Sequence, residues 1–357
     1  MTSKGDHKKV LQPVEPVGRS RAKRGITLLD LAKIAGVSPM SASRALNTPD
    51  QVSEKILQKV RAAASDTGYV ANRLAGGLAS QRSRLVAAVI PSIAGPVFQD
   101  MVQSLIASLA ESRYQLMLGQ SGYGTPREDD LLKAIIGQRP DGIVLGGVVP
   151  SEAGRLQLLA SGIPVVETWD MVESPIDMVV GFSHDEIAVA VAEYLLSRGR
   201  RRLAFVGGDH ARARRRALSF SSAAFDKKRP AARRAKSVHI EAMPAPATMR
   251  GGREALGRLL KLQPDTDAVF CSSDLIALGV MTEAQARGLR VPADLAIIGF
   301  GDLHFAADVS PALSTVHIDG TAIGAIAGRL IIDRSEGRDI AQPIVDIGFS
   351  IITREST

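Results

Sequence analysis

The stretch ITLLDLAKIAGVSPMSASRALN, residues 26–47, decides how the front of the chain folds. In its first half, apolar residues recur at steps of three or four positions, which predicts a helix with one apolar face. That face consists of Leu28, Leu31, Ala32 and Ala35. Thr27 is a suitable N-cap with Asp30 as its capping-box partner, and Gly36 permits the tight turn that follows.

The second half of the stretch predicts another short helix directly after the turn. Ser38 can cap it, and Pro39 occupies its first position, where a missing N–H has no consequence. This helix carries small polar groups, one methionine and one arginine: Met40, Ser41, Ser43, Arg44 and Asn47. Such a pair is typical of a helix-turn-helix whose second helix enters the major groove. A plain helical hairpin is the alternative that this pattern alone leaves open.

Positive charge is concentrated at the front of the chain. Residues 1–84 hold 15 Lys+Arg against 6 Asp+Glu, whereas the rest of the 357 residues hold 29 against 31. A basic excess around a helix-turn-helix is expected for contact with phosphates, although a basic tail alone is often merely solvated. Residues 1–24 combine proline, glycine and many charges with little apolar periodicity, which predicts a disordered basic tail.

Composition and motifs argue against several classes of protein. The single cysteine, Cys271, excludes a disulfide scaffold and fits a reducing compartment. The first residues lack the apolar run of a signal peptide, and no stretch approaches the roughly 20 apolar residues of a membrane span. We therefore expect a cytoplasmic protein with no membrane partner. No complete dinucleotide loop, metal-ligand spacing or catalytic constellation is present, so we expect no cofactor, no metal and no enzyme activity.

Beyond the first two helices, the pattern of apolar residues in the sequence changes at Arg84. Before that point, a third helix is predicted at 54–67, with Ser53 as its cap and an apolar stripe of Ile56, Val60, Ala63 and Ala64. After it, strands are predicted at 85–90, 115–119, 141–145, 163–166, 178–180, 202–206, 237–240, 268–271 and 295–298. Helices are predicted between them at 97–111, 131–137, 156–161, 185–198, 250–260 and 274–286.

This alternation predicts parallel sheets with helices on both faces. The number of strand–helix units exceeds that of one sheet of usual size, so we expect two similar lobes with a cleft between them. In such sheets ligands bind beyond the carboxyl ends of the strands, which makes the cleft the predicted small-molecule site.

Together these features resemble the lactose-repressor (LacI/GalR) family of bacterial transcription regulators over residues 26–357. The motifs that carry the resemblance are TLLDLAKIAGVSPMSASRALN, YVANRLAGGLAS, and VPADLAIIGFGD followed by SPALSTVHID. Within the family, the segments VFQDMVQSL, YQLMLGQSGYG, PDGIVL, GIPVVETWD and VVGFS are most similar to repressors of gluconate utilisation.

The resemblance implies a specific organisation and function. An all-α helix-turn-helix DNA-binding domain would occupy 25–70, and a hinge helix and linker 71–83. An α/β two-lobed, periplasmic-binding-protein-like effector and dimerisation domain would occupy 84–357. The protein would be a homodimeric repressor that binds double-stranded operator DNA under the control of a sugar acid such as gluconate or 6-phosphogluconate. A two-lobed solute-binding protein without a gene-regulatory role is the alternative, and a sugar-modifying enzyme is a third option.

The resemblance also assigns DNA contacts. Pro39, Met40 and Arg44 fall at the family's major-groove positions. Arg44 suits guanine or a phosphate, whereas Met40 suits only apolar contact. The other predicted DNA-binding residues of this domain are Thr27, Ser38, Ser41, Ser43 and Asn47. Hydroxyl groups such as those of Thr27, Ser41 and Ser43 suit the phosphate backbone.

Residues 72–79 match the family's hinge helix. There Asn72, Ala75 and Leu78 are predicted to contact DNA, with Leu78 wedged between base pairs in the minor groove. Ala71 stands where the family usually has proline, and two adjacent glycines follow Ala75. Because glycine lowers helix propensity, we expect the order of this hinge to depend unusually strongly on DNA.

For the effector, the resemblance points to residues at the strand ends. The predicted effector-binding residues are Ser92, Phe98, Tyr123, Trp169, Asp170, Arg216, Ser273 and Asp274. Arg216 matches the arginine that grips the ligand's polar end, and its fork suits a carboxylate, although a basic helix face also accounts for it. Its neighbours Arg212, Arg214 and Arg215 are expected to be solvated. Asp274 suits hydroxyls or, more commonly, a helix cap.

Overall fold

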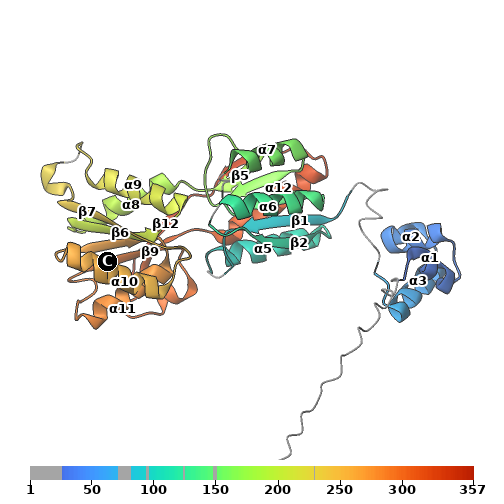
Figure 1. Cartoon of the computed structure of the whole chain (residues 1–357), viewed down its shortest axis with the longest axis horizontal. Coiled ribbons are helices and arrows are strands. Elements are labelled where there is room, and N and C mark those ends of the chain that lie inside the picture. Colours follow the sequence, from blue (N-terminus) through green and yellow to red (C-terminus); the bar gives the residue numbers. More distant parts are fainter. Residues whose placement is uncertain (1–25, 71–81, 94–95, 124, 148–150, 229) are drawn as a thin grey trace, which may run out of the picture. The chain divides into compact units, whose positions relative to one another are not determined.

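The structure is a computed structural model that describes residues 26–70, 82–93, 96–123, 125–147, 151–228 and 230–357 (Figure 1). The chain divides into two compact units, Met1–Gln81 and Arg82–Thr357. The predicted tail and the predicted hinge residues Asn72, Ala75 and Leu78 lie outside the described residues. Predictions about them therefore stay predictions.

The described part of the first unit is a small helical bundle. Its helices are α1 (Leu28–Ala35), α2 (Pro39–Asn47) and α3 (Glu54–Thr67), with a 3₁₀ turn, η1, at Pro49–Gln51. The Thr27 hydroxyl accepts the Asp30 N–H at 3.3 Å, and the Asp30 carboxylate accepts the Thr27 N–H at 2.9 Å, which confirms the predicted capping box. Gly36 ends α1 with a φ of 64°, as the tight turn requires.

The caps and the core of the bundle agree with the predictions from the sequence, with two differences. The Ser38 hydroxyl accepts the Ser41 N–H at 3.1 Å, which confirms it as the cap of α2. Ser53 lies at the cap position of α3 but makes no side-chain cap bond. Of the predicted apolar stripe of α3, Val60 and Ala63 are buried, and Ile56 and Ala64 pack against the core partly buried. Leu57, which the prediction left out, is buried as well.

In the second unit, the described residues form two six-stranded sheets, one in each lobe. The N-lobe sheet is wholly parallel. Its strands, in spatial order, are β11 (Ile344–Asp346), β5 (Met178–Gly181), β4 (Val165–Thr168), β3 (Gly142–Leu145), β1 (Leu85–Ile90) and β2 (Gln115–Gln120). Its helices are α5 (Gln99–Glu111), α6 (Thr125–Gly137), α7 (Glu152–Ser161) and α12 (Gly320–Ser335), with the 3₁₀ turn η2 at Pro96–Phe98.

The C-lobe repeats this plan, except that its first strand is antiparallel to its neighbour. In spatial order its strands are β12 (Ser350–Ile352), β10 (Ser314–His317), β9 (Ala296–Phe300), β8 (Ala268–Cys271), β6 (Arg202–Gly208) and β7 (Ser237–Met243). Its helices are α8 (His184–Ser197), α9 (Ala211–Ala224), α10 (Met249–Leu262) and α11 (Asp274–Ala286), with 3₁₀ turns η3 (Ala231–Arg233) and η4 (His304–Ala307).

Helices cover both faces of each sheet, as the apolar strand runs predict. Along β1, Val86 and Ala88 belong to the cluster that includes residues of α5 and α12, whereas Ala87 and Val89 belong to the cluster with α6 and α7. Every residue of β1 after Leu85 is buried. The predicted two-lobed α/β architecture is therefore confirmed.

The sequence pattern missed or shortened several helices. α6 begins at Thr125 and α7 at Glu152, both earlier than predicted. α12 escaped prediction because Gly320, Gly324 and Gly328 lower its helix propensity. These glycines have a packing reason, since a Cβ at Gly324 would lie 2.2 Å from the main-chain oxygen of Met101 on α5.

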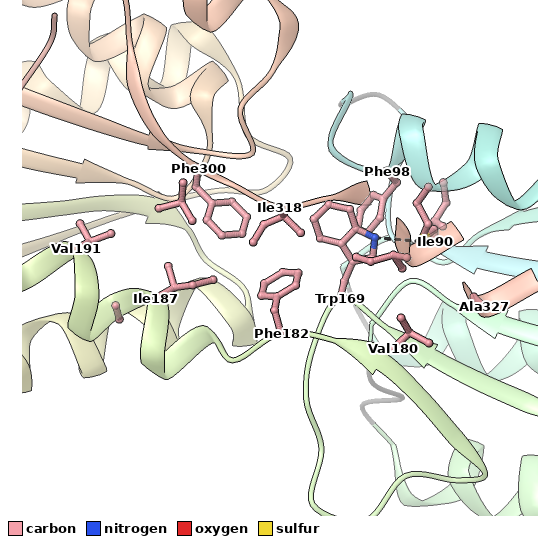
Figure 2. Close-up of a cluster of buried hydrophobic side chains, with 14 of the residues drawn as sticks. Ile90, Phe98, Trp169, Val180, Phe182, Ile187, Val191, Phe300, Ile318 and Ala327 are labelled. Atoms are coloured by element: carbon pink, nitrogen blue, oxygen red, sulfur yellow. Dashed lines mark hydrogen bonds between the residues drawn. The ribbon is translucent and has the colours of Figure 1, made fainter. Parts of the chain in front are cut away.

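In the described part of this unit, the chain crosses between the lobes after β5, after β10 and between β11 and β12. Aromatic side chains fill the crossing region (Figure 2). Ring centroids lie 5.1 Å apart for Phe98 and Trp169, 5.7 Å for Trp169 and Phe182, and 6.1 Å for Phe182 and Phe300. These residues belong to one buried cluster that extends into both lobes. The lobes are thus joined through a packed hinge.

Candidate functional site

The outer face of α2 carries the side chains predicted to read DNA. Ala42 and Ala45 are buried on its inner face, whereas Arg44 and Met40 are exposed, Met40 with 65% of its surface. Among the residues that the structure describes, the Arg44 guanidinium makes no hydrogen bond or ion pair. Its donors are therefore available to a partner. Pro39 and Asn47 are exposed as well.

Most of the side chains predicted to contact the DNA backbone lie near the beginnings of α1 and α2. The hydroxyls of Thr27 and Ser38 cap α1 and α2, and the Ser38 and Ser41 hydroxyl oxygens lie 2.9 Å apart. A helix N-terminus attracts a phosphate through its free N–H groups and its dipole. Ser43 accepts a hydrogen bond from the Asn47 amide at 3.4 Å. The DNA contacts of these residues stay predictions.

A cavity of about 390 Å³ lies between the two lobes. It opens at the carboxyl ends of the N-lobe strands, where Pro91 follows β1, Gly146 follows β3 and Asp170 follows β4. Its position is the one expected for a ligand site in parallel sheets, and its volume suits a small molecule. The charged and aromatic side chains that line it are Tyr123, Glu128, Asp170, His210, Arg212 and Arg215.

Arg212 brings positive charge from the C-lobe into this cavity. Its Nη1 donates to the Gly146 oxygen of the N-lobe at 3.1 Å, and its guanidinium carbon lies 5.7 Å from the Phe98 ring centroid. Burial lowers the pKa of Arg212, but an arginine keeps its charge in proteins. The prediction that Arg212 is solvated is wrong, because it lies one turn from the buried Arg216 on the inward face of α9.

Arg215 also joins the lobes. Its guanidinium lies 3.1 Å from the Asp170 carboxylate of the N-lobe and 2.5 Å from that of Asp185 on α8. Arg215 is therefore paired rather than simply solvated. Burial raises the pKa of Asp170, and the charges of Arg215 and Arg212 oppose that rise. Arg214 is exposed and pairs with Asp209, as expected of a surface residue.

Arg216 does not line the cavity but lies behind it, with only 3% of its surface exposed. Its guanidinium donates to His184 Nδ1 at 3.0 Å and to the Ser272 oxygen at 3.1 Å, and it lies 4.2 Å from the Phe300 ring centroid. Burial lowers the pKa of Arg216 to about 9, so it remains charged at neutral pH. Burial and Arg216 hold the pKa of His184 far below its usual range, so the neutral imidazole accepts this hydrogen bond.

The remaining predicted effector residues fall into three groups. Tyr123 and Asp170 line the main cavity, and Ser92, Phe98 and Ser273 line, with Tyr123, a smaller cavity of about 40 Å³. Trp169 is part of the hinge cluster, where its indole N–H donates to the Met101 sulfur at 3.0 Å.

Asp274 is fully buried and lines neither cavity. Its carboxylate accepts hydrogen bonds from the Thr315 hydroxyl at 2.6 Å and the Leu303 N–H at 2.7 Å. Burial raises its pKa to about 6. It does not cap α11, since the cap is Ser273, whose hydroxyl accepts the Ile276 N–H at 3.4 Å.

Sequence reasoning missed Glu128, His210, Arg212 and Arg215 as cavity residues. Burial and the charge of Asp129 raise the pKa of Glu128 to about 7. The His210 ring stacks on Tyr123 at 5.2 Å between centroids, and burial together with Arg212 lowers its pKa to about 3. The helical spacing of Arg212 and Arg216 was the available signal, because positions four apart share a face.

A helix-turn-helix followed by a two-lobed α/β domain with a charged interlobe cavity defines the class of DNA-binding regulators that respond to a small ligand. In the described part of the chain, no helix is both long and apolar enough to span a bilayer. Nor do the described residues include a group of three or more acidic, histidine or cysteine side chains placed to hold a metal.

Comparison with known proteins places the chain within that class. Residues 27–72 match the family described as bacterial regulatory proteins, lacI family, and residues 192–357 match a periplasmic binding protein-like domain. The HTH-type transcriptional regulator GntR of Pseudomonas aeruginosa is 36% identical over 339 residues, which cover 93% of this chain and 95% of that protein. The chain belongs to the lacI family of bacterial regulatory proteins, which confirms the resemblance seen in the sequence.

Other relatives agree with this assignment. The GntR regulator of Escherichia coli K12 is 29% identical over 92% of this chain and 98% of its own length. The crystal structure of a LacI-family regulator from Silicibacter pomeroyi has a TM-score of 0.85 at 30% identity and covers 93% of this chain and 99% of that one. The Lac repressor dimer bound to operator shares the fold, with a TM-score of 0.78 at 21% identity over 94% of this chain and 99% of that one.

Proposed function

We propose that the protein is a repressor that binds operator DNA as a homodimer and whose operator affinity is set by a sugar acid, gluconate or 6-phosphogluconate. The observation that carries the effector proposal is the half-buried Arg212 in the interlobe cavity. Only one of its five N–H donors has a protein partner among the described residues, the Gly146 oxygen. The others suit the carboxylate of a sugar acid.

The surroundings of Arg212 suit the rest of such a ligand. The carboxyl groups of Asp170 and Glu128 offer oxygens to hydroxyl groups, and the Tyr123–His210 stack offers a ring face and polar edges. The relatives named GntR, and the sequence segments that resemble repressors of gluconate utilisation, support the same ligand class.

The DNA part of the proposal rests on the helix-turn-helix and its exposed α2. A homodimer presents two such helices to half-sites about one helical turn apart, so the operator is expected to be close to palindromic. This activity belongs in the cytoplasm, where operator DNA lies. A solute-binding protein without a regulatory role is disfavoured, since it would not need the lacI-family domain at residues 27–72.

The protein is a binding protein rather than an enzyme in this proposal. The histidine in the cavity, His210, has a pKa of about 3, which makes it a poor general base at neutral pH. The carboxylates of Asp170 and Glu128 are better explained as ligand-binding groups beside Arg212. Incubation of the protein with gluconate, followed by product analysis, checks this point, and turnover would contradict it.

Operator binding in the presence of effector tests the main proposal. Duplexes selected from a random pool by the full chain supply an operator, and gel shift then measures its affinity with and without gluconate or 6-phosphogluconate. The expected result is a palindromic selected site whose affinity changes with at least one of these acids. Failure to enrich any sequence would contradict the DNA proposal, and an operator affinity indifferent to both acids would contradict the effector proposal.

A further inference from the structure

Among the described residues that line the cavity, Glu128 is the one whose charge changes near neutral pH. It lies in the first turn of α6, and its carboxylate has no hydrogen-bond partner among the described residues. Burial and Asp129 disfavour its charge while Arg212 favours it, which together place its pKa at about 7. Asp129 itself does not line the cavity, and its carboxylate accepts a hydrogen bond from the Ser151 hydroxyl.

The other charged groups around the cavity hold fixed charges at neutral pH. Of the described residues that line the cavity, Arg212 and Arg215 carry a positive charge and Asp170 carries a negative charge. His184 and His210 are neutral because their pKa values are strongly lowered, and Tyr123 is neutral because its pKa is raised. Among these described lining residues, one positive charge therefore has no negative counterpart, and ionisation of Glu128 cancels it.

We propose that Glu128 determines the specificity of the cavity by fixing its charge, so that it accepts an acid with a single negative charge together with a proton. A polyhydroxylated monocarboxylic acid meets this condition. A phosphorylated sugar acid adds a phosphate of nearly two further negative charges at neutral pH, which Arg212 alone cannot match. This inference rests on the proposed sugar-acid effector and selects gluconate over 6-phosphogluconate.

Proton uptake follows from the geometry. A ligand carboxylate on Arg212 lies in the same cavity as Glu128, and a like charge nearby raises the pKa of a carboxyl by roughly one unit or more. The affinity of the cavity for an acid with one negative charge is then highest at pH values where Glu128 is already protonated. It falls about fivefold between pH 6 and pH 8, and binding takes up about half a proton at pH 7.5.

Calorimetry on the full chain without DNA tests the proposal. Gluconate is titrated from pH 6 to pH 8, below the pKa of about 9 of Arg216. A second titration at pH 7.5 in two buffers of different ionisation enthalpy gives the number of protons taken up without any variant. Glu128→Gln keeps the size of the side chain and removes its charge. Asp130→Asn is the matched control, because Asp130 lies two residues away on the same helix but is exposed.

The wild-type protein and Asp130→Asn should show the fivefold pH dependence and the proton uptake, and Glu128→Gln should lose both. At pH 8, Glu128→Gln should bind 6-phosphogluconate at least tenfold more tightly than the wild type. Binding of gluconate without proton uptake, or an unchanged pH dependence in Glu128→Gln, would overturn the role of Glu128 alone. If gluconate fails but glucuronate or galactonate binds, the proposed effector is wrong and the same comparison with that acid decides the role of Glu128. If no acid binds, both proposals fall.

Discussion

The role of Arg212 can be recognised only once the fold is known. In the sequence it is one of four arginines within five positions of a basic segment. In the structure it contacts both lobes, through its own helix and through the Gly146 oxygen, whereas Arg214 faces solvent and pairs with Asp209. The difference arises because α9 presents only one face to the cavity.

Replacement of this arginine gives a direct prediction. Arg212→Ala should weaken gluconate binding by about 2–3 kcal/mol, since charge-assisted hydrogen bonds to the carboxylate are lost. Operator affinity without ligand should change little, because the helix-turn-helix is untouched. Calorimetry and gel shift on the same preparations measure the two effects. Arg214→Ala removes the same charge outside the cavity and should bind gluconate normally; equal losses in both variants would refute the assignment.

Arg44 is the corresponding residue of the DNA-binding domain. Arg44→Ala should weaken operator binding by about 1–3 kcal/mol and relax the preference for one base pair if the guanidinium reads guanine. Anisotropy titrations with the selected operator and its single-base variants measure both effects. Lys33→Ala, a charge change on exposed α1, is the control. A uniform loss on all sequences would reassign Arg44 to a phosphate.

Asp274 makes stability depend on pH. Its pKa is raised to about 6 by burial, so folding favours the protonated carboxyl. Its stabilising contribution is complete below the ordinary aspartate pKa of about 3.9 and is lost as pH rises through 6, a change of about 3 kcal/mol. In Asp274→Asn, the amide oxygen can accept the Leu303 N–H and the amide NH2 can donate to the Thr315 hydroxyl, whose hydrogen turns away. The variant should therefore gain stability relative to the wild type from pH 4 to pH 7.

Urea unfolding followed by tryptophan fluorescence checks this expectation. Trp169 is the only tryptophan of the chain and lies in the second unit, so the signal reports the unit that contains Asp274. The control is Asp308→Asn, at an exposed position, whose stability should differ from that of the wild type by the same amount at every pH. If the stability of Asp274→Asn also ran parallel to that of the wild type, the buried carboxyl would not titrate in this pH range.

Among the elements, α12 is the helix whose formation depends most clearly on packing rather than on local helix propensity. Its glycines at positions 320, 324 and 328 recur every four residues and face α5. Gly324→Ala should destabilise the second unit by about 2 kcal/mol, because the new methyl group meets the rigid main chain at Met101. The midpoint of urea unfolding measures this effect. Thr321→Ala, on the exposed face of the same helix, should change it little, and equal stability of both variants would contradict the proposed close packing.

Elements with strong local signals could be predicted from the sequence, and those specified by packing could not. β1 and α3 have the predicted bounds, because an apolar run and a helix with a glycine stop are local features. The helix α12 depends on glycines that only its partner α5 explains. The same holds for the site: Tyr123 and Asp170 follow strands and were found, whereas Arg212 required the orientation of α9.

At the scale of the whole second unit, the lobes are joined by a packed hinge and by two arginines. Phe98, Trp169 and Phe182 connect the lobes at the crossings, and Arg212 and Arg215 bridge them at the cavity. A ligand that binds Arg212 thus touches both lobes and stabilises one arrangement of them over others. A ligand can shift such an equilibrium only by its difference in affinity for the two arrangements.

The coupling between effector and DNA tests the central claim of a ligand-controlled repressor most directly. Coupling between two binding sites is reciprocal, so gluconate must change operator affinity by the same factor as operator changes gluconate affinity. Both dissociation constants should be measured on the full chain, by anisotropy of labelled operator and by calorimetry with and without saturating operator. The predicted result is an equal change in both constants, by a factor of about five or more. Tight gluconate binding with no change in operator affinity would contradict the account.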